Sequence, residues 1–586
     1  MKRGAPVLLL LRRRQRQQQL SPLGTTGQAS SGNHALSRQM DSSSSESSGR
    51  YGYNPTLRWN SQVEEYFNKA YGADHFARIS KALTYPSCYS CIRVNTLKSS
   101  IDAVIKKLTS ILHEKDLQSS IDSTCMGKST ASAPGDCDLK LLSREVESVG
   151  DSKCLSIHKS QLPGLDYVLF VKGSGPHVLQ YGGKSGQPIK EVIVSRKCAE
   201  AVLRGAQVFV PGVLACTSHV EKGDTVAVSV AVEQSAPDGE WSVGITRGTV
   251  LQGLQSDPRY HERSGLYIGN GVAMLSRAGL FRASEGIAVE MSNRIYKLPS
   301  FHNVLEGEIF LQNLPSIVAA HVLDPREGER ILDMCAAPGG KTTAIAALMK
   351  DKGEVIALDR SHNKVADILK LAEEMGLTCI SAYKLDALKA VWKKSDIDAG
   401  LTSYGTKISS GIVENFRFPD SNMPTYRNEY IPDLTIKNCE ENQKPDRPTS
   451  FGKTDVRKNT QRVRNGPGKN NCGGSRVACS KGFLPDSFDR VLLDAPCSAL
   501  GLRPRLFAGE ETVESLKNHA KYQRRMFDQG VQLVRPGGVI VYSTCTINPG
   551  ENEALVRYAL DTYKFLSLAP QQPRIGGSGL VGCCEL

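Results

Sequence analysis

An alternation of apolar segments and amphipathic helical patterns, starting near residue 329, constrains the fold of this 586-residue chain more than any other feature. The apolar segments of strand length are residues 330–335, 354–359, 378–386, 488–494 and 537–547, with a further short one at 564–570. The helical patterns are residues 342–350, 363–375, 513–534 and 551–560. Parallel strands need long crossover connections, which helices supply, so this order predicts an α/β domain with a mostly parallel sheet.

The first strand–helix connection of this domain has the sequence DMCAAPGGKT, residues 333–342. Adjacent glycines, Gly339 and Gly340, let the backbone approach a ligand closely, and the helix start supplies N–H donors. A P-loop needs glycine where Cys335 stands, which argues against an NTPase. The fingerprint GxGxxG is also absent, which argues against an NAD-dependent oxidoreductase.

Two acidic residues follow the next two predicted strands. Asp359 ends residues 354–359, where a carboxylate can accept hydrogen bonds from both hydroxyls of a ribose. Asp386 ends residues 378–386, where its oxygens can meet the amino group of an adenine ring. The alternative for either residue is a helix N-cap. Together with the glycine turn, the pair favours a cofactor that carries a nucleoside.

Cysteines follow two later strands, Cys497 in DAPCS and Cys545 in STCT. The carboxyl ends of parallel strands meet at one edge of a sheet, so we expect both thiols on the same side as the glycine turn. Either cysteine alone is adequately explained as a buried apolar thiol. The two together predict covalent chemistry.

The blocks DMCAAPGGKT, LDAPCSALG and VYSTCTINPGENE resemble the signatures of the Nop/Sun family of RNA cytosine-5 methyltransferases, over most of residues 300–565. This resemblance implies a Rossmann-like domain that uses S-adenosylmethionine. It implies that Cys545 adds to carbon 6 of cytosine and that Cys497 assists release of the product. It further implies that Asp494, in protonated form, hydrogen-bonds the ring nitrogen, and that Lys341 positions the base or lowers the thiol pKa.

The same resemblance implies which residues hold the cofactor. They are Cys335, Ala336, Ala337, Pro338, Gly339, Gly340, Lys341, Asp359, Asp386 and Asp494. No metal site is predicted, because the CxxC pair Cys88 and Cys91 has no second close pair to complete a zinc site.

Residues 188–283 differ in character from the rest, with short β-rich segments separated by Gly, Pro and charged turns. They resemble a PUA domain, a small RNA-binding barrel, and the alternative is a purely structural barrel. The segment RVNTLK, residues 93–98, is similar to the N-terminal RNA-binding region of the family. The family branch with a PUA domain methylates a cytosine near the acceptor end of tRNA, so tRNA is the expected partner.

The charge balance, 73 Lys and Arg against 60 Asp and Glu, gives +13, which suits a polyanionic partner. No apolar run is long enough for a membrane span, and nothing predicts an obligate protein partner.

The first 40 residues hold six Arg, one Lys and no acidic residue. This composition fits a disordered basic leader or a transit peptide, and Met40 offers an internal start. We therefore expect a cytoplasmic or nuclear location, with an organelle left open.

The predicted organisation has five parts. They are a disordered leader at 1–50, an N-terminal RNA-binding region at 51–187, the PUA-like domain at 188–283, a connecting segment of the N-terminal region at 284–328, and the catalytic domain at 329–586 with a disordered insertion at 394–482. Residues 117–158 have the composition of a surface insertion.

The end of the chain departs from the family pattern, which closes the sheet with a last antiparallel strand beside the strand that leads to Cys545. GSGLVGCCEL does not resemble that strand, so we expect an open sheet edge and a less stable domain. An alternative is therefore a tRNA-binding protein whose methyltransferase domain is truncated and inactive. A DNA cytosine methyltransferase, which would rely on Cys497, is disfavoured by the Thr-Cys block and the PUA-like region.

Overall fold

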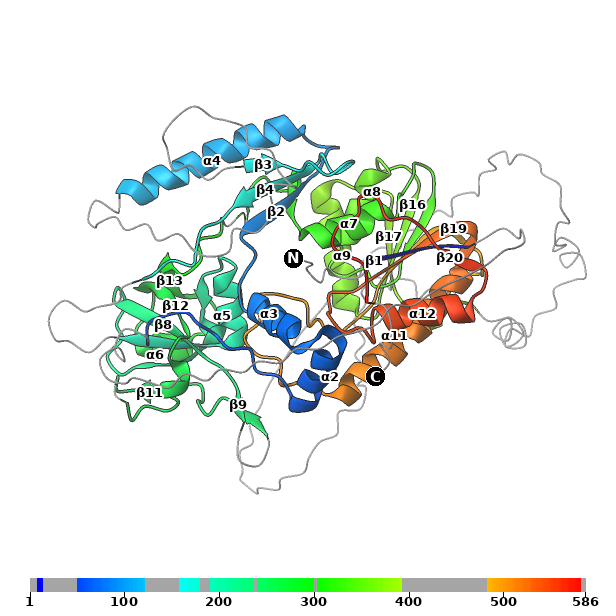
Figure 1. Cartoon of the computed structure of the whole chain (residues 1–586). Helices are drawn as coiled ribbons and strands as arrows, with labels where there is room; N and C mark the ends of the chain where they lie inside the picture. The colour runs from blue at the N-terminus through cyan, green and yellow to red at the C-terminus, as the bar shows by residue number, and fades with distance from the viewer. Residues whose placement is uncertain are drawn as a thin grey trace, which may run out of the picture. The chain divides into compact units, whose positions relative to one another are not determined.

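The structure is a computed structural model that describes residues 8–13, 50–121, 157–179, 190–235, 240–392 apart from 254, 300 and 302, and 482–580. Its strands form sheets of seven, seven, four and two strands (Figure 1). The predicted insertions at 117–158 and 394–482 fall almost entirely outside the described residues, as does the leader apart from residues 8–13 and 50. No helix in these ranges is long and apolar enough to cross a membrane.

The catalytic sheet has the order β17-β16-β15-β18-β19-β1-β20. Its strands are β15 (Arg330–Asp333), β16 (Glu354–Asp359), β17 (Ile380–Lys384), β18 (Phe488–Asp494), β19 (Val534–Ser543), β1 (Leu8–Arg13) and β20 (Leu566–Leu568). The five strands from β17 to β19 pair in parallel. The predicted Rossmann-like α/β sheet is thus confirmed, including the short strand near the end.

Helices cover both faces of this sheet because successive strand residues alternate between two cores. Ile331 and Val539 belong to the core that includes helices α7 (Leu314–Val322), α8 (Gly340–Leu348) and α9 (His362–Met375). Their neighbours Leu332 and Ile540 belong to the core with α11 (Val513–Leu533) and α12 (Glu553–Thr562). A sheet buried on both faces explains the continuous apolar runs of its strands.

The expected open edge beside β19 is not observed. β1 lies between β19 and β20 and pairs antiparallel with both, with Leu11 opposite Ile540 and Leu568 (Figure 1). The expectation of an unpaired β19 was therefore wrong, and so was the prediction of a disordered leader at 1–50 where it covers residues 8–13. The physical reason is that a strand far away in sequence can satisfy the backbone groups that a missing neighbour would leave exposed.

The N-terminal region contains helices and a small antiparallel sheet. Its helices are α2 (Ser61–Tyr71), α3 (Ala73–Leu83) and α4 (Ile101–Ile121), and its sheet has the order β14-β2-β4-β3. These strands are β2 (Tyr89–Val94), β3 (Ile157–Lys159), β4 (Val168–Lys172) and β14 (Ile309–Leu311). β14 comes from the predicted connecting segment and pairs with β2, so the chain returns to this sheet after the PUA-like domain.

The second seven-stranded sheet forms the PUA-like domain, in the order β11-β7-β5-β8-β12-β13-β6. Its strands are β5 (Glu191–Ser195), β6 (Val208–Phe209), β7 (Val213–Thr217), β8 (Thr225–Ala231), β11 (Thr249–Leu251), β12 (Tyr267–Ala273) and β13 (Ile287–Arg294), with helices α5 (Arg196–Leu203) and α6 (Arg277–Arg282). β9 (Gln234–Ser235) and β10 (Trp241–Ser242) pair separately. The sheet continues past residue 283 because β13 pairs with both β12 and β6.

Candidate active site

Four strands of the catalytic sheet end in a polar side chain at the same edge. Asp333, Asp359, Asp494 and Ser543 are the last residues of β15, β16, β18 and β19. Because these strands are parallel, the loops that carry the predicted cofactor and cysteine residues all leave the sheet at this edge.

The turn between β15 and α8 is held in a fixed shape by buried contacts. Gly339 has a φ of 104°, in the left-handed region that favours glycine. The N–H of Ala336 donates to Leu358 O over 2.9 Å, which ties the turn to β16. Thr342 Oγ1 donates to Asp333 Oδ2 over 2.8 Å. Burial raises the pKa of Asp333 to about 6.

The two predicted nucleoside ligands each use one oxygen locally. Asp359 Oδ1 accepts from the N–H of Ser361 over 2.8 Å, and Asp386 Oδ1 accepts from that of Leu388 over 3.0 Å. Asp386 caps a short 3₁₀ helix two residues after β17 ends at Lys384, so the N-cap alternative describes part of its role. Within the described ranges, the second oxygen of each carboxylate accepts no hydrogen bond.

Asp494 joins the glycine turn to the end of β19. Lys341 Nζ donates to Asp494 Oδ2 over 2.6 Å, and Ser543 Oγ donates to Asp494 Oδ1 over 2.6 Å. With both oxygens accepting, Asp494 is arranged here as an acceptor, whereas the sequence led us to expect a donor.

The two predicted reactive thiols are in direct contact. Cys497 Sγ and Cys545 Sγ lie 3.3 Å apart, and the N–H of Cys545 points to Cys497 Sγ at 3.4 Å. Both are free cysteines that are neither fully buried nor fully exposed. The structure therefore brings together residues 48 positions apart in the sequence.

The contact makes the two thiols chemically unequal. The pKa of Cys545 is lowered, first by the hydrogen bond from Cys497 and further by the positive charge of Lys341. The pKa of Cys497 is raised by that hydrogen bond and by burial. Burial also raises the pKa of Cys335 well above its ordinary value, which keeps this thiol protonated. Cys545 is the better nucleophile of the three.

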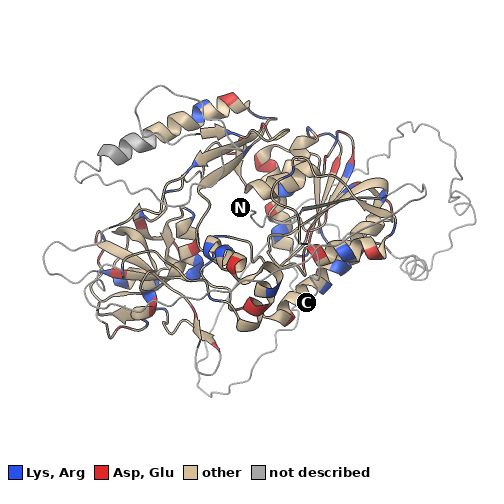
Figure 2. Cartoon of the chain, viewed as in Figure 1, with Lys and Arg blue, Asp and Glu red and all other residues tan. Residues whose placement is uncertain are grey.

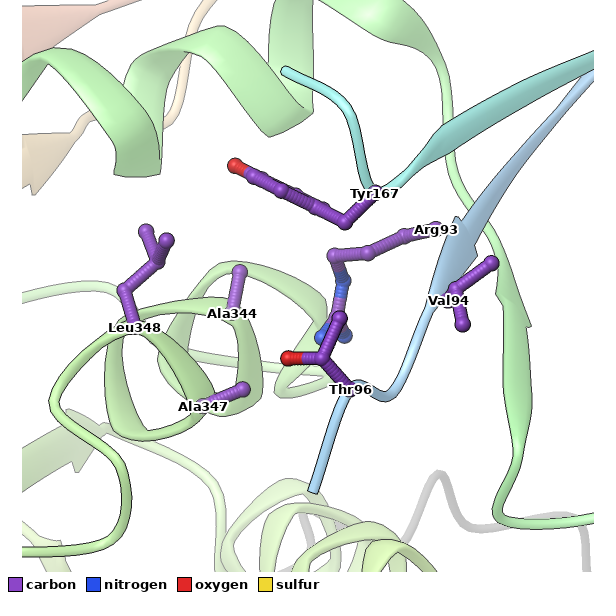
Figure 3. Close-up of a pocket in the computed structure, with 7 residues that line it drawn as sticks. All are labelled: Arg93, Val94, Thr96, Tyr167, Ala344, Ala347 and Leu348. Carbon is purple, nitrogen blue, oxygen red and sulfur yellow. The ribbon is translucent and has the colours of Figure 1, made fainter. Parts of the chain in front are cut away.

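Arg93, in the segment RVNTLK of the N-terminal region, contacts the start of α8, directly after the glycine turn. Its guanidinium donates to Gln312 Oε1 and to Thr343 Oγ1, each over 2.9 Å. Figure 3 shows Arg93 reaching from β2 toward α8 beside a small cavity that Tyr167 also lines. Burial lowers the pKa of Arg93 to about 10. None of the predicted catalytic residues lines this cavity. The hydrogen bonds of Arg93 therefore stabilise the glycine turn from outside the candidate site.

Comparison with known proteins decides the family. The profile described as 16S rRNA methyltransferase RsmB/F matches residues 320–401 and 454–575, and the PUA domain profile matches residues 190–231. The rRNA (cytosine-C(5))-methyltransferase NOP2C of Arabidopsis thaliana is 58% identical over 560 residues, which are 94% of this chain and 88% of that protein. The chain belongs to the Nop/Sun family of RNA cytosine-5 methyltransferases.

Members named for tRNA are also similar to this methyltransferase. The human tRNA (cytosine(72)-C(5))-methyltransferase NSUN6 is 32% identical over 532 residues, 90% of this chain and 84% of that protein. The crystal structure of NSun6 from Pyrococcus horikoshii with SFG, an S-adenosylmethionine analogue, aligns with a TM-score of 0.55 at 25% identity. It covers 89% of this chain and 92% of that one. The predicted family, fold, PUA domain and S-adenosylmethionine dependence are confirmed.

The methyltransferase carries basic residues close to its catalytic sheet edge. Figure 2 shows Lys and Arg along α11, where Lys521 and Arg525 are exposed one helical turn apart. Between them lies Tyr522, whose charged neighbours include Arg360 and Asp386. This part of α11 is therefore near the turn that follows β17.

In the described ranges, no three His, Cys, Asp or Glu side chains group as ligands for a metal ion.

Sequence reasoning missed the buried residues that hold the site together. Asp333 begins the segment DMCAAPGGKT but was assigned no catalytic or binding role. Glu551, in the segment NPGENE, was assigned none either. Both are buried acids, with exposed fractions of 1% and 0%. Acidic residues are rarely buried without partners, so only their contacts, which the sequence does not give, identify them.

Proposed function

We propose that this protein methylates carbon 5 of a cytosine near the acceptor end of tRNA through a covalent adduct with Cys545. The observation that carries the proposal is the 3.3 Å contact between Cys545 and Cys497 beside the Lys341–Asp494 ion pair. A buried structural thiol has no need of a second thiol and a cation. The contact also argues against an inactive relic, because the reactive groups are already assembled.

The edge of the sheet fits S-adenosylmethionine. Asp359 and Asp386 each keep one carboxylate oxygen for a ribose or an adenine, and the start of α8 offers N–H donors to a carboxylate. The residues that would hold the cofactor are the turn from Cys335 to Lys341, with Asp359, Asp386 and Asp494. When bound, the cofactor supplies the electrophilic methyl group that carbon 5 receives.

Cys545 prepares the base for this transfer. Its thiolate forms a bond to carbon 6, and the displaced electron pair makes the ring an enamine that is nucleophilic at carbon 5. For Asp494 to donate to the ring nitrogen, one of its present donors must move aside and the carboxylate must take up a proton from solvent. The ring nitrogen takes that proton as carbon 6 is attacked, which stabilises the adduct, and returns it to Asp494 when the adduct breaks. Lys341 keeps the thiolate available before attack.

Cys497 takes the proton that must leave carbon 5. Its pKa is raised mainly because it donates to Cys545, and that acceptor weakens once Cys545 sulfur is bound to carbon. Adduct formation thus lets Cys497 transfer its own proton to solvent and then act as the base. Removal of the carbon 5 proton restores the double bond, breaks the Cys545 sulfur–carbon bond and returns the thiolate.

The choice of tRNA rests on the PUA domain and on the relatives named for tRNA cytosine 72. A domain that grips a tRNA end can present one unstacked cytosine to the site. A ribosomal substrate is the second candidate, because the Arabidopsis relative at 58% identity is named for rRNA.

The test is to trap the adduct. The Cys497→Ala protein is mixed with S-adenosylmethionine and either unmodified tRNA or ribosomal RNA, and the mixture is run on a denaturing gel. We expect a protein–RNA band with tRNA that is absent from the Cys497→Ala/Cys545→Ala double variant. A band with ribosomal RNA alone would overturn the tRNA assignment. No band with either RNA, from protein that binds the cofactor, would overturn the adduct mechanism.

A further inference from the structure

Glu551 is a fully buried carboxylate that accepts four hydrogen bonds. Oε1 accepts from Ser498 Oγ over 2.5 Å and from Asn548 Nδ2 over 3.0 Å. Oε2 accepts from the N–H of Ser498 over 3.1 Å and from Gln523 Nε2 over 2.7 Å. The exposed fractions of Glu551, Asn548 and Gln523 are all 0%. Each of the two carboxylate oxygens therefore accepts two hydrogen bonds.

These donors come from both cysteine loops and from the helix behind them. Ser498 follows Cys497 directly, and Asn548 lies in the loop that Cys545 begins. Gln523, on α11, also donates to Pro496 O over 2.9 Å, on the other side of Cys497. Glu551 thus links the two loops, and its hydrogen bonds with Ser498 join residues 53 positions apart in the sequence.

The link extends outward but contains no cation. The hydroxyl of Tyr542, on β19, lies 2.9 Å from Gln523 Oε1 and 2.8 Å from Glu551 O, and it shares its one proton between these two acceptors. Tyr66 of α2 donates to Asn548 Oδ1 over 3.0 Å. No Lys or Arg of the described ranges forms an ion pair with Glu551. Its carboxylate is held by neutral donors alone, which is costly unless all of them stay in place.

We infer that Glu551 is a positioning residue that locks the Cys497 and Cys545 loops together and so sets the distance between the two thiols. The inference rests on the proposed function of those thiols. It explains why an acid is needed: glutamine has the same shape, but its amide nitrogen is a donor and would face two donors. A carboxylate is the group that can accept all four bonds.

The test compares Glu551→Gln with Glu553→Gln. Glu553 is a matched control because it lies two residues further, is only half-buried, and has one oxygen, Oε2, with no partner. The readout is the pH profile of Cys545 alkylation by iodoacetamide, followed by peptide mass spectrometry in the full chain without RNA or cofactor. It reports the thiol–thiol contact whether or not methyl transfer occurs.

We expect the Cys545 profile of Glu551→Gln to move to higher pH, because loosened loops weaken the hydrogen bond that favours the thiolate. The Glu553→Gln profile should match the wild type. With tRNA, kcat should fall by about 10- to 100-fold in Glu551→Gln, with KM for RNA little changed, as a misplaced reactive group predicts.

An unshifted alkylation profile in folded Glu551→Gln protein would overturn the inference. Should Glu551→Gln not fold, Ser498→Ala replaces it, because it removes one of the four bonds and keeps the backbone donor. A smaller shift in the same direction supports the inference, and no shift overturns it. If the shift occurs while wild-type protein forms no 5-methylcytosine in any RNA, the proposed function fails and the positioning role stands.

Discussion

Lys341 Nζ lies 2.6 Å from Asp494 Oδ2, so one ion pair joins the cofactor turn to the strand that precedes Cys497. The same lysine lowers the pKa of Cys545 through its charge. In Lys341→Met we expect that pKa to rise and the rise of single-turnover rate with pH to move to higher pH. At neutral pH the rate should fall about tenfold for each increase of one in the pKa, because the thiolate fraction falls by that factor.

The matched control for Lys341 is Lys341→Arg, which keeps the charge. Its profile should stay near that of the wild type even if its rate is lower. The measurement is methyl transfer to tRNA in a single turnover between about pH 6 and pH 10, which spans the ordinary cysteine pKa. Identical profiles for Lys341→Met and the wild type would mean that Lys341 does not tune the nucleophile.

Asp333 gives a pH dependence of stability with a defined sign. Its pKa is raised to about 6 in the folded protein, against about 3.9 in an unfolded chain. The folded state then holds its proton more tightly, so its stability decreases as pH rises from about 4 to about 6. The charged form costs up to about 3 kcal/mol above that window, which Asp333→Asn avoids.

We therefore expect the thermal midpoint of Asp333→Asn, relative to the wild type, to increase as pH rises from about 4 to 7. Thermal unfolding of the two proteins in parallel buffers measures this difference. The control is Asp489→Asn. Asp489 is half-buried near the start of β18, whereas Asp333 is the last residue of the neighbouring strand β15. A relative midpoint for Asp333→Asn that stays constant over this range would contradict the raised pKa.

The strand ends that carry the chemistry could be predicted from sequence because each follows a short apolar run. This holds for Asp359, Asp494 and Cys545, whose loops do leave one sheet edge. The pairing of Leu11 with Leu568 could not be predicted, since it joins the two ends of the chain and an apolar run among arginines also fits a leader. Glu551 was missed because an acid before a helix usually fits a solvated first turn.

Lys521 and Arg525 are exposed on α11 near the site, so they are suited to contact RNA phosphates. Replacing both with alanine should weaken tRNA binding. The slope of log K against log salt concentration should also become shallower, by about 0.7 to 0.9 for each phosphate contact that is lost. Binding titrations at several salt concentrations measure this slope. Lys564→Ala, which removes an exposed lysine paired with Asp561, is the control and should leave the slope unchanged.

The place of β1 between β19 and β20 predicts that residues 8–13 stabilise the catalytic domain. Leu10→Pro removes an N–H and inserts a ring opposite Val541 of β19, one residue before the pairing with β20 begins at Leu11. A strand in the interior of a sheet does not tolerate proline. We expect a lower thermal midpoint and faster hydrogen exchange in β19 and β20. β20 should be affected most, because β1 is its sole strand partner among the described residues.

Leu10→Val is the control for this strand, because it keeps the N–H and valine favours strands. A chain that begins after residue 13 should behave like Leu10→Pro if the effect comes from lost pairing. Unchanged exchange in β19 and β20 for both the proline variant and the shortened chain would show that β1 does not hold the sheet. Since β19 leads directly to Cys545, the proposed nucleophile, loss of β1 should also slow adduct formation.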